Sequence, residues 1–311
     1  MGLRPSIFFC GRHGTARLHQ IPKESRSMKK VILITDSTAS LSPQQTQQYG
    51  IATVPLIVIW GAETYEDSVT ITPSEFYAKL QTAKVMPSTS QPSAGTFQQA
   101  FEKLLEQDYD ILGMFISSKL SGTMQSAIQA RDLLTHGKEK ITLFDSESTT
   151  VAMALQVLTV ARAAEAGESL PSCLKIAEAA RAQSGVYFVV DTLEFLHRGG
   201  RIGGAARFFG TALNMKPILT IREGKIEAQE RIRTKGKALD RLIELVGEQT
   251  RGKSGIHLVA AHSNTEAEAL AVLRRASAQT SPVESFSANL SPVIGTHTGP
   301  GTVALAYLHG F

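Results

Sequence analysis

A hydroxyl-rich segment in the middle of the chain is the strongest candidate for chemistry. Residues 117–123 read Ser-Ser-Lys-Leu-Ser-Gly-Thr and follow an apolar run that is typical of a buried strand. Apolar residues after Thr123 recur at helical spacing, so a strand, a polar loop and a helix start are predicted. The first turn of a helix has unpaired N–H groups and the positive end of the dipole, which favours a carboxylate or a phosphate. Ser121 or Thr123 could instead simply cap the helix, and both interpretations stay open.

Two other segments carry side chains that could join the same site. Residues 86–93 are rich in Ser and Thr, and two prolines hold their backbone extended, so we expect a rigid loop that presents Thr89 and Ser90. His297 lies in the sequence Gly-Thr-His-Thr-Gly-Pro-Gly, whose glycines and proline predict a helix start. The alternative for His297 is a structural, hydrogen-bonded histidine.

Strands and helices alternate in the first half of the chain. Apolar runs predict strands at residues 31–34, 51–60, 111–116 and 141–144, and helical spacing predicts helices at 43–49, 72–83, 93–107, 124–134, 151–166 and 171–183. Thr72, Pro73 and Glu75 have the spacing of a capping box with proline at the first helical position. This order predicts a parallel sheet covered on both faces, with polar loops sharing the edge at the carboxyl ends of its strands.

The pattern changes near Gly185. Strands are predicted at residues 186–190, 218–222, 225–233, 256–261 and 283–287, and helices at 205–214, 235–248, 265–278 and after residue 301. Glu223 and Gly224 between two strand-like segments predict a two-residue hairpin, and therefore antiparallel pairing. The sequence thus predicts an α/β protein of two domains, a parallel-sheet domain over residues 28–184 and a domain with antiparallel pairing over residues 185–311.

The positive charge is confined to the N-terminus. The whole chain has a net charge of +4, and residues 1–27 alone carry that charge, so the remainder is neutral. The basic surface of a nucleic-acid-binding protein is therefore not expected on the fold. Because residues 1–27 show little hydrophobic periodicity, we expect them to be a disordered basic extension or to precede the natural start at Met28.

Membrane and metal signals are weak. No apolar run reaches the roughly 18 residues of a membrane span, so stable membrane insertion is not expected and the protein is expected to be soluble. Cys10 and Cys173 are far apart and lack the spacing of a zinc site. This cysteine usage favours a cytoplasmic protein without a disulfide framework or a metal.

The sequence does not support the common enzyme motifs, which are either absent or found in the wrong structural context. Residues 247–254 match the P-loop pattern letter for letter, but that motif needs a strand before it and a helix after it. Here a helix is predicted before the motif and a strand after it, which argues against nucleotide binding. Neither the G-x-S-x-G elbow of serine hydrolases nor the H-E-x-x-H motif of zinc proteases occurs in the chain.

Five motifs occur in a fixed order along the chain. They are Thr-Asp-Ser-Thr at residues 35–38, Thr-Ser-Gln-Pro-Ser at 89–93, Ser-Ser-Lys-Leu-Ser-Gly-Thr at 117–123, Arg-Gly-Gly-Arg-Ile at 198–202 and Thr-His-Thr-Gly-Pro-Gly at 296–301. Together they resemble the DegV family of bacterial fatty-acid-binding proteins, over residues 29–307. The resemblance implies a two-domain α/β fold that holds one long-chain fatty acid, with its carboxylate against Thr89 and Ser121.

The residue chemistry and the resemblance agree on the position of the anion. We expect the carboxylate at the first turn of the helix after residue 122, where it would accept charge-assisted hydrogen bonds. The residues expected to form this site are Thr89, Ser90, Ser118, Ser121, Gly122 and His297.

The resemblance also implies a partner. Family members that serve as the acyl-binding subunit of fatty acid kinase present the carboxylate to a separate ATP-binding kinase, which forms an acyl phosphate. By this resemblance the chain has no catalytic residue and no cofactor of its own. Arg198 and Arg201 lie in a loop with four glycines, so exposed guanidinium groups are expected to dock the kinase, unless they only pair with groups of their own domain.

Two other functions remain open. One is a stand-alone hydrolase or transferase that acts on a carboxylate or phosphate ester through Ser121 and His297. The other is a nucleotide-binding protein.

Overall fold

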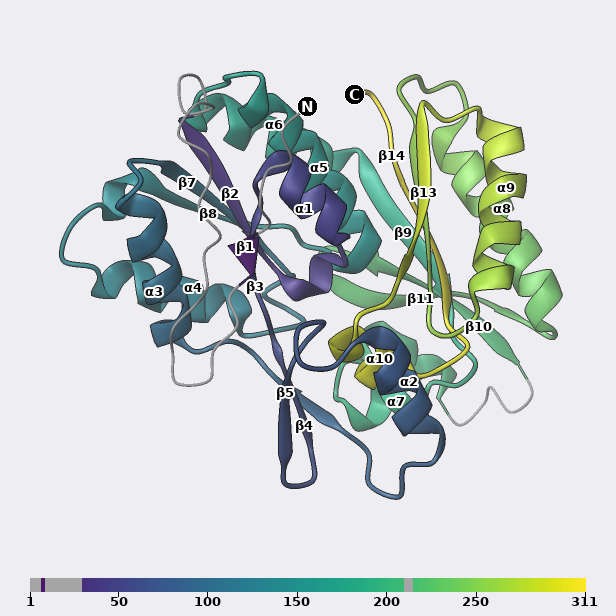
Figure 1. The fold of residues 1–311 in the computed structure, drawn as a ribbon. Coiled ribbons are helices and arrows are strands. Elements are labelled where there is room, and N and C mark those ends of the chain that lie inside the picture. The colour runs from purple at the N-terminus through teal and green to yellow at the C-terminus, as the bar shows by residue number, and fades with distance from the viewer. Residues whose placement is uncertain (1–6, 9–29, 210–214) are drawn as a thin grey trace.

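A computed structural model of the chain describes residues 7–8, 30–209 and 215–311 (Figure 1). The helix predicted at residues 205–214 is a 3₁₀ helix, η4 (Gly203–Phe208), and residues 210–214 lie outside the described residues. No described helix is both long and apolar enough to cross a bilayer.

The first sheet is parallel, as the alternation of strands and helices predicts. Among the described residues its strand order is β1-β3-β2-β7-β8, formed by β1 (Ile7–Phe8), β2 (Val31–Asp36), β3 (Ala52–Val54), β7 (Asp110–Phe115) and β8 (Ile141–Asp145). One face packs against α3 (Ala94–Leu105) and α4 (Thr123–Leu133). The other face packs against α5 (Thr150–Glu165) and α6 (Leu170–Ala182), with α1 (Pro43–Tyr49) beside α5.

The second sheet combines antiparallel and parallel pairing. Its order is β11-β10-β9-β14-β12-β13, and within the described part of the chain only β12 and β13 run parallel. The strands are β9 (Ser184–Val189), β10 (Lys216–Arg222), β11 (Lys225–Ile232), β12 (His257–His262), β13 (Glu284–Asn289) and β14 (Val303–Leu308). The outer face carries α8 (Lys235–Thr250) and α9 (Glu266–Thr280). Glu223 and Gly224 form the predicted hairpin turn, both with positive φ.

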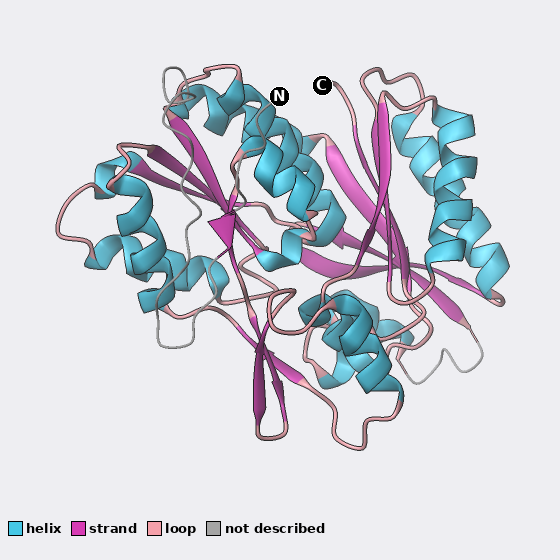
Figure 2. Ribbon diagram, in the orientation of Figure 1, coloured by secondary structure: helices cyan, strands magenta, loops and turns pink. Residues whose placement is uncertain are grey.

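Helix α5 lies between the two sheets. It contacts β2 on one side and β9, β12 and β14 on the other, and nearly all of its side chains are buried. Figure 2 shows the resulting order of layers, with helices outside each sheet and α5 and α6 between the sheets. The fold is the two-domain α/β architecture predicted from the sequence, while the boundary near Gly185 stays a prediction.

A small third sheet bridges the two halves. It has the order β5-β4-β6, with β4 (Ile57–Trp60), β5 (Glu63–Glu66) and β6 (Ser88–Ser90). The single strand expected at residues 51–60 is therefore wrong: Pro55, which lacks an N–H, lies between β3 and β4, and the chain changes sheet there. Helix α2 (Pro73–Gln81) begins with the predicted capping box and packs with β4 against Val293 of the second half.

Two expectations near the C-terminus need correction. Helix α10 (Pro292–Thr298) ends at the glycines where we expected a helix to begin, and the residues that follow form β14 rather than a last helix. Gly299 and Gly301 have φ of 73° and 79°, which suits a chain leaving a helix. In the N-terminal extension, Ile7–Phe8 pair with β3; the rest of residues 1–27 lies outside the described residues, and the expectation for the extension stays a prediction.

Candidate ligand-binding cavity

A cavity of about 810 Å³, including the space open to solvent at its mouth, lies among α10, β9, β10, β14 and the polar loops of the first sheet. Most of the wall is apolar and includes Ile116, Leu120, Val186, Phe188, Ile226 and Ile294. The polar groups of the wall include Thr89, Ser90, Gln91, Ser121, Arg201 and His297.

Thr89 and His297 form the centre of the polar wall. Thr89 lies on β6 and His297 in the last turn of α10, and Thr89 Oγ1 is 2.8 Å from His297 Nε2. Nδ1 of His297 is buried and has no hydrogen-bond partner among the described residues. Burial and the nearby positive charge of Arg201 lower the pKa of His297 to about 4. The imidazole is therefore neutral at neutral pH.

Helix α10 is held in place by a buried carboxylate. Ser291 caps the helix and Pro292 occupies its first position, which is the arrangement that sequence reasoning recognised at α2 and missed here. Asp67 Oδ1 accepts a hydrogen bond of 3.0 Å from the backbone N–H of Val293, and Asp67 Oδ2 accepts one of 2.6 Å from Ser37. Burial raises the pKa of Asp67 to about 6. These bonds fix the helix that carries His297 against the first half of the chain.

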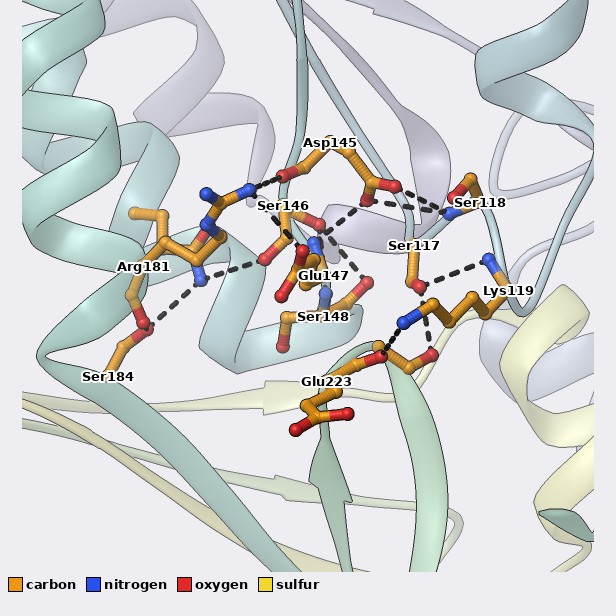
Figure 3. A network of polar contacts seen from close by, with 12 residues as sticks. Ser117, Ser118, Lys119, Asp145, Ser146, Glu147, Ser148, Arg181, Ser184 and Glu223 are labelled. Carbon is orange, nitrogen blue, oxygen red and sulfur yellow. Dashed lines mark hydrogen bonds and ion pairs between the residues drawn. The ribbon is translucent and has the colours of Figure 1, made fainter.

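The loop before α4 is anchored to both sheets (Figure 3). The backbone N–H of Ser117 donates to the carbonyl of Ser148, and Ser117 Oγ donates to the carbonyl of Gly224 in the β10–β11 turn, each at 2.8 Å. Further along the loop, Ser121 Oγ lies 2.8 Å from Thr123 Oγ1 and accepts a bond of 3.3 Å from the Thr123 N–H. Ser121 thus has a local capping role at the edge of the cavity.

The other residues expected at the carboxylate site occupy different positions. Ser90 lines the cavity. Gly122 is the N-cap residue of α4 and lies against Gln91, whose Nε2 would be 3.0 Å from a Cβ at position 122. Ser118 is exposed and is not part of the cavity wall; its N–H donates to the Asp145 carboxylate instead (Figure 3). The expected reach of Ser118 into the site is therefore wrong, because its loop turns it toward β8.

The two arginines of the glycine loop differ in environment. Arg198 is exposed and pairs with Glu194 at 2.6 Å within α7 (Glu194–Arg198). Arg201 is partly buried, and its guanidinium group donates to the carbonyls of Leu120 and Gly199. The expectation that Arg201 is exposed is wrong: the loop folds back so that Arg201 lines the cavity.

Several cavity residues were not predicted. Gln91 lies inside one of the five sequence motifs, and Thr298 follows His297 directly, so the motifs themselves contain the signal for both residues. Thr149, Thr150 and the apolar wall come from segments far apart in the chain, which sequence periodicity does not bring together. Among the described residues, no group of three or more His, Cys, Asp or Glu side chains is placed to hold a metal ion.

Gly199 lies against the His297 side chain, and its lack of a Cβ leaves room for the imidazole. A Cβ atom at Gly199 would lie 2.1 Å from His297 Nδ1. We expect Gly199→Ala to displace the imidazole from Thr89 and to cost about 1–3 kcal/mol of unfolding free energy, measured by urea denaturation. Gly236→Ala in α8 is the control, because a Cβ there meets no atom within 4 Å and the backbone does not have a positive φ. Equal losses in the two variants would show that the ring position does not depend on Gly199.

The fold and the cavity define the class of protein. A parallel α/β domain and a mixed-sheet domain enclose an apolar cavity with one polar wall, as in a two-domain α/β protein built around a single ligand site. The family model described as "Uncharacterised protein, DegV family" matches residues 30–310, and the chain belongs to the DegV family. The resemblance seen in the five sequence motifs is thereby confirmed.

Relatives extend over nearly the whole chain. A DegV domain-containing protein from Clostridium perfringens is 37% identical over 279 residues, which cover 89% of this chain and 98% of that protein. A solved DegV family protein from Thermus thermophilus, described as fatty acid binding, is 36% identical with a TM-score of 0.85, over 90% of this chain and 100% of that one. DegV from Bacillus subtilis, described as a fatty acid binding protein, is 32% identical with a TM-score of 0.83, over 91% of this chain and 100% of that one.

Proposed function

We propose that the protein binds one long-chain fatty acid, with the acyl chain in the apolar part of the cavity and the carboxylate at its polar wall. The observation that carries the proposal is a cavity that joins an apolar wall to a cluster of Thr89, Ser121, Arg201 and His297. The description of two solved relatives as fatty acid binding supports it.

The acyl chain would provide most of the affinity. Roughly fourteen methylenes, at about 0.8 kcal/mol each, give an upper limit of about 11 kcal/mol before the costs of ordering and association. The carboxylate contributes less to affinity, but it fixes the orientation of the ligand. A binding protein of this kind needs no catalytic group and no cofactor.

The polar wall can bind a carboxylate because it offers one charged hydrogen-bond donor and several neutral ones. Arg201 offers a guanidinium group, whose hydrogen bonds to a carboxylate are charge-assisted. Because His297 is neutral, its Nε2–H can donate to Thr89 Oγ1, which leaves the Thr89 hydroxyl proton for the carboxylate. This assignment also leaves Nδ1 without a proton, in agreement with its lack of a partner among the described residues.

The finer proposal is that the bound acid is presented to a separate ATP-binding kinase, which converts it to an acyl phosphate. It rests on the family resemblance, and it makes the protein a non-catalytic subunit that works in the cytoplasm. Arg198 is the better candidate for docking the kinase, since its guanidinium group is exposed while that of Arg201 faces the cavity. The test is acyl phosphate formation from ATP and fatty acid, which should require both the kinase and this protein.

The hydrolase alternative has less support. A serine hydrolase needs the histidine within hydrogen-bond reach of the serine nucleophile. Here His297 Nε2 pairs with Thr89, and Ser121 pairs with Thr123. Ester turnover by the protein alone would favour the hydrolase over the binding protein.

The binding proposal has a direct test. Native mass spectrometry of the protein purified from bacteria should show a bound long-chain fatty acid. Ser121→Ala removes one hydroxyl donor, so we expect about tenfold weaker fatty-acid binding with an unchanged fold, measured by displacement of a fluorescent fatty acid. Exposed Ser118→Ala is the matched control and should bind as the wild type does. Unchanged affinity in folded Ser121→Ala would place the carboxylate elsewhere.

A further inference from the structure

The N-terminus of α5 forms a second polar element in the wall of the same cavity. Thr149 and Thr150, the N-cap and first residue of this 16-residue helix, both line the cavity. Both are buried, with exposed fractions of 8% and 6%. The helix start is therefore turned away from bulk water, where its free N–H groups would otherwise be satisfied.

The start of α5 lacks a side-chain cap. Among the described residues no side chain caps this helix, although its N-cap residue is a threonine, a type that commonly does so. Thr149 Oγ1 is buried and has no hydrogen-bond partner among the described residues. A buried polar group without a partner is unfavourable, and native proteins rarely keep one unless a ligand or water pairs with it.

Thr150 adds a sign of strain at the same place. Its φ is +47°, which is unusual for a β-branched residue, and strained residues of this kind cluster at ligand sites. The preceding loop is held firmly: Ser146 Oγ donates to the Ser148 carbonyl, and Arg181 donates to the Asp145 carbonyl (Figure 3). The strain at Thr150 is thus maintained by its surroundings.

We propose that the N-terminus of α5 is a subsite for a neutral oxygen function carried on the acyl chain, so that the preferred ligand is a hydroxy or oxo fatty acid. This inference rests on the proposed function and specifies its substrate class. A hydroxyl or oxo oxygen would accept from the helix N–H groups and from the Thr149 hydroxyl, whereas a plain acyl chain would leave these groups unpaired.

The ligand carboxylate and the subsite oxygen have different partners in the cavity wall. Arg201 carries a positive charge and is assigned to the carboxylate, whereas the α5 start contributes only the neutral side chains of Thr149 and Thr150. A neutral oxygen therefore suits the α5 start.

The test compares stearic acid with hydroxystearic acids that carry the hydroxyl near the carboxylate, at mid-chain and near the methyl end. In the wild type, one isomer should bind about tenfold more tightly than stearic acid, measured by displacement of a fluorescent fatty acid. Thr149→Val keeps the shape but removes the hydroxyl, and should reduce that preference to about twofold or less while strengthening stearic acid binding several-fold.

Control variants test whether the ligand preference depends specifically on the Thr149 hydroxyl. Thr159→Val removes a hydroxyl from the same helix, at a buried threonine whose Oγ1 donates to the Leu155 carbonyl, and should keep the preference. Thr149→Ser retains the donor and should also keep it, and Thr149→Ala replaces the valine variant if that variant does not fold. The inference is wrong if no isomer outbinds stearic acid, or if Thr149→Val or its alanine replacement leaves the ratio unchanged. If the wild type binds none of these acids, the proposed function itself is wrong.

Discussion

Arg201→Ala should weaken the binding of a long-chain fatty acid about a hundredfold, because the variant loses the positive charge that lies in the cavity wall. Hydrogen bonds to charged groups contribute about 1.5–3 kcal/mol, and a hundredfold change corresponds to about 2.7 kcal/mol. The dissociation constant can be measured by displacement of a fluorescent fatty acid. The fold should persist, since the bonds that Arg201 makes are to loop carbonyls and not to the core.

Arg198→Ala is the matched control in the same loop. Its side chain is exposed and pairs with Glu194, so fatty-acid affinity should stay within about twofold of the wild type. If Arg198 docks the kinase, the same variant should bind fatty acid normally but support less acyl phosphate formation. Similar fatty-acid affinities for the two alanine variants would exclude Arg201 from the carboxylate site and restore it as a docking residue.

Acid should destabilise the ligand-free protein through His297. The pKa of His297 is lowered to about 4 in the folded protein from 6.5, so between these values the unfolded chain binds the proton and the folded protein does not. The contribution of His297 to stability is therefore complete above about pH 6.5 and is lost as the pH falls to about 4. A shift of this size corresponds to about 3 kcal/mol of unfolding free energy.

The measurement is urea unfolding of the wild type and His297→Asn across this pH range. As the pH falls, the unfolding free energy of the wild type should decrease by about 3 kcal/mol relative to that of the variant. Asp36 and Asp67 act in the opposite direction, because burial raises the pKa of each to about 6, so their protonation favours the folded state as the pH falls from about 6 toward 4. The wild type and His297→Asn both contain Asp36 and Asp67, so the effect of these two carboxylates cancels in the difference between the two proteins.

His136→Asn is the control for loss of a histidine. His136 is exposed, so its replacement should leave the wild-type pH dependence in place. If His297→Asn shows the same dependence as the wild type, His297 does not stay neutral in the folded protein.

Local signals predicted those parts of the fold whose cause is local. The capping box of α2 and the Glu223–Gly224 turn each depend on a few neighbouring residues, and both are confirmed. The order of elements predicted the parallel first sheet. The same kind of local signal, Ser291 followed by Pro292, marks the start of α10, whereas the glycines after His297, which we expected to begin a helix, follow the end of this one.

The cavity depends on contacts between residues far apart in sequence. Sequence motifs named Thr89, Ser121 and His297, and all three line one cavity. Motifs did not indicate that the loop after α7 folds back, so Arg201 was expected at the surface. The motifs also did not indicate Thr149. Its hydroxyl is notable because it has no hydrogen-bond partner among the described residues, and this is visible only in the folded structure.

The position of α5 has a consequence for folding cooperativity. This helix belongs to the first half of the chain by sequence, yet one of its faces packs on β2 and the other on β9, β12 and β14. Separating the halves would expose an apolar helix face and the sheet that it covers, which is unfavourable in water. We therefore expect the two halves to unfold as one cooperative unit, because the inner face of the second sheet is covered by Val151, Ala152 and Leu155 of α5, which the first half supplies.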